Sequence, residues 1–204
     1  MPVNLEEVLA ALSGPRISLT GAESRVPGRP GLYAVYGPPA VWKELGLGKP
    51  PDGRPLYVGK SESSLLARDI GTHFGDGRTG QSTVRRSLAA LLREHLQLQG
   101  QPRNAEKPGY FSNYGLSPGD DAKLTAWMRK HLKLANWAPA KPLQLRPVES
   151  QVIIRWQPPL NLTDVITGWT PEIKAARKLM ADEARAWLSD LQTLSRARTP
   201  RRET

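Results

Sequence analysis

The sequence predicts an α+β domain built on a small, mostly antiparallel three-stranded sheet that is flanked by helices. Two short apolar runs, residues 31–36 and 55–61, are rich in aromatic and β-branched residues and are bounded by Gly and Pro, a pattern typical of strands. A third run, at 132–137, precedes the last helix of the core. Between the second and third runs, apolar residues recur at helical spacing. We expect the domain over residues 28–165, with a helical insertion at about 75–131.

Helical appendages are expected at both ends of this domain. Residues 1–27 contain an amphipathic helix at 4–13. Residues 166–204 contain a longer helix that begins near Pro171, a favourable first-turn position for proline, and runs to about Ser195. A basic tail follows that helix.

The two tyrosine-bearing runs are expected to pair as a hairpin. The link between them, residues 37–54, holds several Gly and Pro residues, so we expect a long loop with one helical turn at 41–45. Tyr33 lies on the first strand, while Tyr57 and Gly59 share one face of the second. Cross-strand packing is the ordinary interpretation of such a tyrosine pair. Gly59, however, favours the close approach of a ligand or of another backbone.

A helix is expected after the second strand, with Ser61 or Ser63 as its N-cap. Its apolar stripe carries the inward residues Leu65, Leu66 and Ile70. Arg68 lies on the border of that stripe, where an arginine is usually a surface residue with a buried stem. His73 lies at the helix end, where a lone histidine is usually structural.

The insertion is expected to hold two helices, one from Ser82 or Thr83 to about Gln97 and one over 117–134. The packing residues expected on their apolar faces include the histidines His95 and His131. The loop between them mixes Lys107 with aromatic residues, namely Tyr110, Phe111 and Tyr114. These rings could stack on unpaired bases, but we favour their folding back into the core.

Glu149 is the most unusual residue of the last core helix. At 100° per residue, Val152, Ile153 and Trp156 lie within about 60° of it on the helical wheel, so it falls on the face expected to pack on the sheet. A buried carboxylate is costly unless it is paired, protonated or bound to a metal. Pairing with an arginine is the ordinary interpretation, and a metal ligand is the alternative.

The charge of the chain favours an acidic polymer as its partner. The formal net charge is +10 and the pI is about 10.1. Residues 78–133 carry ten Arg or Lys against four Asp or Glu, and residues 166–204 carry eight against five. Clustered basic charge of this kind supplies salt-dependent nucleic-acid affinity. Within the insertion, Arg85 and Arg86 are the favoured phosphate contacts.

Other classes of protein are disfavoured. The absence of cysteine excludes disulfides and thiolate metal sites. No apolar stretch is long enough to span a bilayer, and the N-terminus lacks an apolar secretory segment. We therefore expect a cytoplasmic protein with no membrane partner.

In their order along the chain, these residues resemble the GIY-YIG nucleases. Gly-Leu-Tyr at 31–33 and Tyr-Val-Gly at 57–59 correspond to the two motifs that give the family its name, with Leu and Val each replacing Ile. Arg68 takes the position of the family's arginine, Glu149 that of its metal-binding glutamate, and Asn161 that of the asparagine that follows. His73 follows Arg68 one residue later than the family pattern implies.

The resemblance implies hydrolysis of DNA phosphodiester bonds with one divalent metal, Mg²⁺ or Mn²⁺. Glu149 would bind the metal, since one carboxylate with water and phosphate oxygens is an ordinary Mg²⁺ shell. Arg68 would contact the phosphate through the N–H donors of its planar guanidinium group. Tyr33 would act as the base and Tyr57 would position the water or phosphate. Because an unperturbed tyrosine has a pKa of about 10, the base needs a nearby helper.

Lys60 and His73 are the two candidate helpers, and Gly59 and Asn161 are expected to support the site. The expected nucleic-acid contacts are Arg85, Arg86, Lys107, Arg129 and Lys130. Two alternatives stay open: a DNA-binding module with a degenerate site, and a nuclease for RNA or for structured or single-stranded DNA. The oligomeric state and the biological pathway are not predicted.

Overall fold

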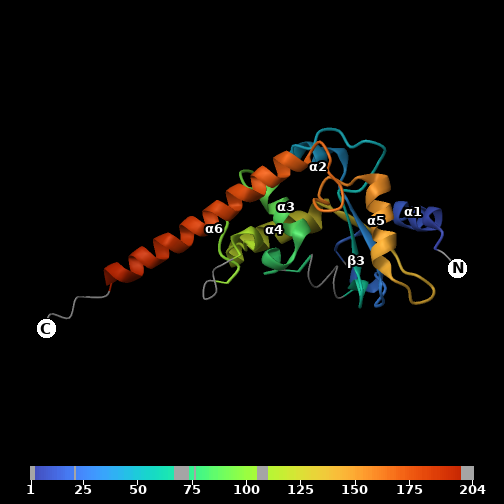
Figure 1. Ribbon diagram of the computed structural model, residues 1–204, viewed down its shortest axis with the longest axis horizontal. Coiled ribbons are helices and arrows are strands. Elements are labelled where there is room, and N and C mark those ends of the chain that lie inside the picture. Colours follow the sequence, from blue (N-terminus) through green and yellow to red (C-terminus); the bar gives the residue numbers. More distant parts are fainter. Residues whose placement is uncertain (1–2, 21, 67–73, 76, 105–109, 199–204) are drawn as a thin grey trace.

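The computed structural model describes residues 3–20, 22–66, 74–75, 77–104 and 110–198. Its centre is a sheet with the strand order β1-β4-β2-β3, in which each pair of neighbours is antiparallel. The strands are β1 (Ile17–Ser18), β2 (Gly31–Tyr36), β3 (Tyr57–Ser61) and β4 (Lys133–Trp137). Every residue of β2 is buried, and β2 lies between β4 and β3 in the sheet. Figure 1 shows the chain coloured along its sequence, with the edge strand β3 labelled.

The α+β fold class is confirmed, with one more strand than the sequence predicts. The three apolar runs form β2, β3 and β4. The additional strand, β1, pairs Ile17 with Leu134 and Ser18 with Lys133. A two-residue strand is too short to show period-two alternation, so only its pairing in the folded chain reveals it.

The register of the sheet brings the two tyrosine motifs together. Tyr33 on β2 lies opposite Gly59 on β3, and Val35 lies opposite Tyr57. Because β3 is an edge strand, its outer backbone groups are not paired with another strand of the sheet. The two tyrosine motifs therefore lie side by side at one edge of the sheet.

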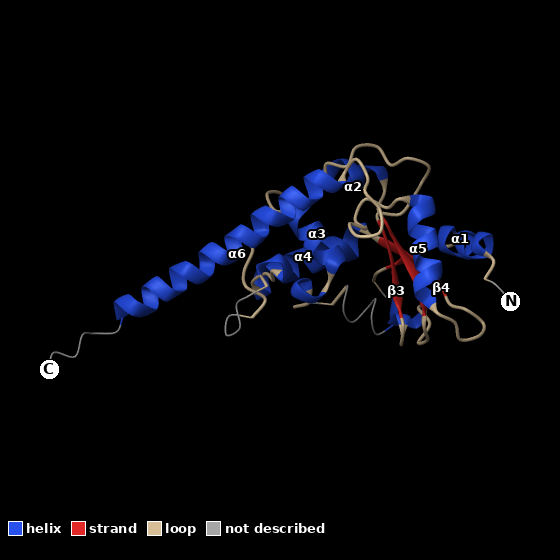
Figure 2. Ribbon diagram, viewed as in Figure 1, coloured by secondary structure: helices blue, strands red, loops and turns tan. Residues whose placement is uncertain are grey.

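One face of the sheet is covered by α1 (Leu5–Ser13) and α5 (Leu145–Trp156) (Figure 2). Val8 and Leu12 of α1 share a core with Val148 and Val152 of α5. Asn4 caps α1 by accepting a hydrogen bond from the Glu6 amide at 3.1 Å. The N-terminal segment thus contributes both a helix and a strand to the sheet layer rather than standing apart from it.

In the described part of the chain, the α-helices that lie toward the other face are α2 (Pro39–Glu44), α3 (Thr83–Leu91), α4 (Pro118–His131) and α6 (Thr170–Arg198). The helical turn expected in the loop between β2 and β3 is α2. The first half of α6 packs on the core through Ile173, Met180 and Ala184, and the helix then extends away from the body (Figure 1). No helix in the described part of the chain is long and apolar enough to cross a membrane.

The insertion forms its two predicted helices, but α3 is shorter than expected. Ser82 caps α3 and Ser117 caps α4 through side-chain hydrogen bonds to backbone amides. Because α3 ends at Leu91, its apolar face does not continue to His95. The prediction that His95 packs in the core is wrong: it is exposed, with Nε2 3.1 Å from Oε1 of Glu44. His131 does pack, 5.1 Å from Trp127 between ring centroids.

The aromatic residues of the insertion loop divide between core and surface. Tyr114 is buried and donates its hydroxyl hydrogen bond to the Arg86 carbonyl at 2.5 Å. Phe111 is half-buried, and Tyr110 is exposed. The prediction that these rings fold back into the core is therefore correct for Tyr114, partly correct for Phe111 and wrong for Tyr110.

The expectation that Arg85 contacts phosphate is wrong. Its side chain is 0 % exposed, and Nη2 lies 3.0 Å from Oδ2 of Asp121 on α4. Nη2 also donates to Thr125, and Nε donates to Thr79. A buried arginine fixed by a carboxylate and two hydroxyls is not accessible to a nucleic acid. Its role is to join α3 to α4.

We expect the Asp121→Ala variant to lose stability because it leaves the Arg85 charge buried without its partner. Breaking a buried pair in this way costs about 3–5 kcal/mol. The loss can be measured as the change in free energy of unfolding by urea. Replacing both residues with apolar side chains of similar volume should cost less than Asp121→Ala alone. An Asp121→Ala variant as stable as the wild type would contradict this role.

Candidate active site at the edge strand

The candidate site is a hollow of about 310 Å³ at the edge strand β3. Its lining is mostly polar and combines the residues Tyr33, Tyr57, Lys60, Ser61, Glu62, Ser63, Arg146 and Glu149. They come from β2, from β3 and the turn after it, and from α5. Residues far apart in the sequence, including three that the family motif singles out, therefore meet in one place.

The two tyrosines converge across Gly59. The ring centroids of Tyr33 and Tyr57 are 6.0 Å apart, with the planes tilted by 42°. A Cβ atom on Gly59 would lie 2.5 Å from Cζ of Tyr33 and 2.8 Å from Cε1 of Tyr57. These distances are well inside van der Waals contact. Glycine at this position is thus what allows both phenol rings to occupy the same end of the hollow.

Glu149 reaches the hollow from α5. Its neighbours Val148 and Val152 pack against Val58, which lies on the opposite face of β3 from Tyr57. Glu149 is 6 % exposed, and burial raises the pKa of its carboxyl group. A hydrogen bond from Arg146 acts in the opposite direction and favours the carboxylate.

Arg146 is a site residue that the sequence analysis missed. Nη1 donates to Oε2 of Glu149 at 3.1 Å, and the guanidinium also pairs with Asp164. These two partners, Asp164 first, raise the pKa of Arg146. The i,i+3 spacing of Arg146 and Glu149 on one helix could have indicated their pairing. Asp164 lies in the loop after the helix, where spacing alone predicts no contact.

Lys60 and Ser61 bring the turn after β3 into the hollow. The Lys60 ammonium pairs with the Glu62 carboxylate. Its positive charge also lowers the pKa of Glu149, although less than the hydrogen bond from Arg146 does. Two cations, Lys60 and Arg146, therefore line the same hollow as the two phenols.

Asn161 holds α5 and β3 in their relative positions. Its Nδ2 donates to the Val58 carbonyl at 2.8 Å, and its Oδ1 accepts from the Val58 amide at 2.9 Å. The Leu160 amide donates to the Leu56 carbonyl at 3.0 Å. Together these bonds continue the ladder on the open side of β3. They fix the segment after α5, and hence Glu149, against the strand that carries Tyr57.

Several expected site residues are not brought to this hollow by the described structure. Arg68, His73 and Lys107 lie outside the described residues, as does most of the helix expected after β3. Arg129 and Lys130 are exposed on the last turn of α4 and do not line the hollow.

The lining suits a hard divalent cation. The lining residues with oxygen-bearing side chains are two glutamates, two serines and two tyrosines, and oxygen is the ligand type that Mg²⁺ and Mn²⁺ prefer. Among the residues that the structure describes, no group of three or more His, Asp or Glu side chains could hold a metal ion. Glu149 with water and substrate oxygens fits an ion that retains much of its hydration.

Comparison with known proteins agrees with this geometry. A family model described as the GIY-YIG catalytic domain matches residues 52–180, more than half of the chain. The match includes Tyr57, Glu149 and Asn161, begins after β2 and ends within α6. No curated protein and no solved structure matches the chain. The extent of the family match shows that the chain belongs to the GIY-YIG family, whose catalytic domains are nuclease domains.

Proposed function

We propose that this protein is a divalent-metal-dependent endonuclease that hydrolyses phosphodiester bonds in DNA. The observation that carries the proposal is the convergence of Tyr33, Tyr57 and the buried Glu149 on one hollow at the edge of the sheet. A phosphodiester is anionic, so its hydrolysis requires groups that offset the charge developing on its oxygens. The hollow supplies cations and hydroxyl groups for that purpose, and Glu149 adds a carboxylate that can hold a metal ion.

Glu149 is the residue that would hold Mg²⁺ or Mn²⁺. When bound, such an ion polarises the phosphoryl group and offsets the negative charge that builds during attack. In the structure described here, Arg146 provides the positive charge beside Glu149. Because Asp164 also binds Arg146, the guanidinium has a second partner that keeps it near the hollow while Glu149 serves as a ligand.

Tyr33 is the candidate base. Its ring is 1 % exposed and packed within the core, so its position is set by the fold rather than by the substrate. Lys60 and Arg146 line the same hollow, and nearby positive charge favours the phenolate form. Tyr57 is less buried and is suited to orienting the attacking water or a phosphate oxygen by hydrogen bonding.

Arg68 is assigned to the phosphate on the family motif, and Asn161 is assigned a positioning role. A guanidinium offers two parallel donors to phosphate oxygens. Asn161 contacts the backbone of Val58 rather than the hollow, so it acts by keeping β3 and α5 in register.

We expect Glu149→Gln to abolish cleavage and to leave nucleic-acid binding nearly unchanged, because the amide keeps the shape but is a poor ligand for a hard cation. Supercoiled plasmid and a labelled single strand would be incubated with the wild type and the variant in Mg²⁺, Mn²⁺ and EDTA.

The matched control for that experiment is Glu7→Gln, which removes an exposed carboxylate on α1 and should cleave as the wild type does. Activity of the wild type in EDTA, or full activity of Glu149→Gln, would sink the proposal. The substrate that is cut faster distinguishes duplex from single-stranded DNA.

We expect Gly59→Ala to reduce the rate of cleavage strongly, because the added methyl group would displace the rings of Tyr33 and Tyr57. A misplacement of about 1 Å in a reacting group costs on the order of a hundredfold in rate. The comparison is single-turnover cleavage by this variant and by Gly28→Ala, where an added Cβ meets nothing within 4 Å. Equal rates for the two variants would remove Gly59 from the site.

A further inference from the structure

Three arginines form a cluster beside the candidate active site that the proposed chemistry does not use. The arginine cluster consists of Arg86 on α3, Arg103 in the insertion loop and Arg177 on α6. Within the described part of the chain, none of the three forms an ion pair with a carboxylate. The cluster thus differs from Arg85, its neighbour in sequence, which is neutralised by Asp121.

Among the described residues, Arg86 is buried without a compensating acid. Its side chain is 7 % exposed, and its donors reach only uncharged oxygens, the Gly80 carbonyl at 2.9 Å and the Thr83 hydroxyl at 3.3 Å. Its Nε is buried with no hydrogen-bond partner. Burial, together with the positive charges of Arg177 and Arg103, lowers the pKa of Arg86 to about 10.

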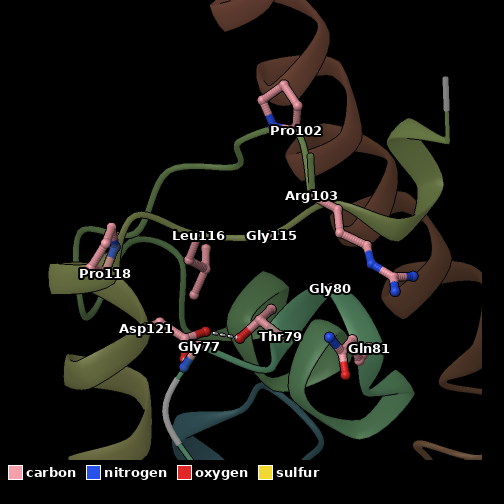
Figure 3. Close-up of a pocket in the computed structure, with 10 residues that line it drawn as sticks. All are labelled: Gly77, Thr79, Gly80, Gln81, Pro102, Arg103, Gly115, Leu116, Pro118 and Asp121. Carbon is pink, nitrogen blue, oxygen red and sulfur yellow. Dashed lines mark hydrogen bonds between the residues drawn. The ribbon is translucent and has the colours of Figure 1, made fainter. Parts of the chain in front are cut away.

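Arg103 packs on the same glycine that Arg86 contacts. A Cβ atom on Gly80 would lie 2.7 Å from Cγ of Arg103, so the two arginine side chains meet at this residue. Figure 3 shows the Arg103 guanidinium directed away from Asp121, the carboxylate that lines this part of the surface. Asp121 is already bonded to Thr79 and Arg85.

Arg177 is half-buried on α6 and has no hydrogen bond or ion pair among the residues described. Burial lowers its pKa. It lines a hollow of about 480 Å³ with three further basic residues, Lys174, Lys178 and Arg185. Asp182, in the same hollow, is already bonded to Lys178 at 2.5 Å and to Arg185 at 2.7 Å.

Among the residues that the structure describes, Glu183 of α6 is a further acid near the cluster, and it is engaged elsewhere. Glu183 accepts from Nε of Arg93 at 2.6 Å and from the Gly100 amide at 2.9 Å. Guanidinium groups that repel one another and lack a carboxylate are stabilised when an anion binds between them. Phosphate suits this arrangement because its oxygens match the planar fork of arginine.

The cluster is close to the candidate active site. The Tyr57 phenol, which lines the hollow at β3, is among the groups whose charge acts on Arg86. A nucleic-acid strand with one phosphate beside Tyr57 and Glu149 carries its next phosphates a few ångströms further along. The arginines therefore lie where a neighbouring phosphate of a bound strand would pass.

We propose that Arg86, Arg103 and Arg177 form a second phosphate subsite, which binds a backbone phosphate of the nucleic-acid strand next to the one that is cleaved. The insertion and α6 supply this subsite jointly. The inference rests on the proposed function, since it takes the hollow at β3 as the place of cleavage.

The test measures binding separately from cleavage. Fluorescence anisotropy would follow labelled single-stranded DNA, its duplex and the RNA of the same sequence, each of about 20 nucleotides, between about 50 and 300 mM KCl. All variants would carry Glu149→Gln, so that the probe stays intact. Arg177→Gln should reduce the slope of log K against log salt by about one, and Arg103→Gln with Arg177→Gln by about two.

The control is Arg155→Gln, which removes an exposed arginine on α5 and should leave the slope unchanged. Arg86 is not substituted, because it is buried and its loss would more readily unfold the protein. Arg103 and Arg177 are tested instead. Circular dichroism would verify that each variant is folded. An unchanged slope for the double variant, or no binding of any probe, overturns the subsite.

Cleavage by the otherwise native protein separates the two proposals. Metal-dependent cleavage with an unchanged salt slope would overturn the subsite and leave the nuclease standing. A reduced slope without any cleavage would support the subsite and overturn the nuclease. With both proposals correct, Arg177→Gln raises KM and leaves kcat close to that of the wild type. Comparison of the DNA and RNA probes shows which backbone the subsite accepts.

Discussion

The geometry of the site depends on how the outward backbone groups of the edge strand β3 find hydrogen-bond partners. An edge strand has outward backbone groups that need partners, and here Asn161 satisfies both such groups of Val58. A second strand would have covered the side of β3 where the hollow lies. A single amide side chain completes the hydrogen bonding over one residue and leaves Tyr57 and Lys60 accessible. The same two bonds connect the end of α5 to the strand, so the carboxylate and the phenols share one rigid frame.

Within that frame, the phenols and Glu149 both benefit from nearby positive charge, but for different reasons. The phenols need a neighbouring positive charge to ionise near neutral pH, while the buried Glu149 needs one to remain a carboxylate. Lys60 and Arg146 line the hollow together with these groups, and both act against the burial that raises the pKa of Glu149. Each cation also has its own acid, Glu62 for Lys60 and Asp164 for Arg146. The two cations are therefore each balanced by a carboxylate, and these ion pairs hold them at the hollow.

The sequence was informative where a local pattern coincides with a functional constraint. A glutamate on an apolar helix face and a glycine in a strand both violate a packing preference. Glu149 lines the hollow, and Gly59 packs against the two tyrosines that line it. The pairing of Arg85 with Asp121 follows no local pattern, because it depends on how two helices separated by a long loop dock. Likewise, His95 was misplaced because the premature end of α3 is not encoded in its apolar spacing.

Arg85 and Arg86 show why net charge alone does not locate a nucleic-acid surface. The two are adjacent on α3, about 100° apart around its axis. Arg85 is neutralised by Asp121 of α4, whereas Arg86 is buried near Arg177 of α6 with no acidic partner in the part of the chain that the structure describes. The basic residues of the insertion are therefore not equally available to bind an anion. The part that remains uncompensated lies where the insertion meets α6, beside Tyr57. The insertion and α6 thus jointly place positive charge near Tyr57, which lines the hollow.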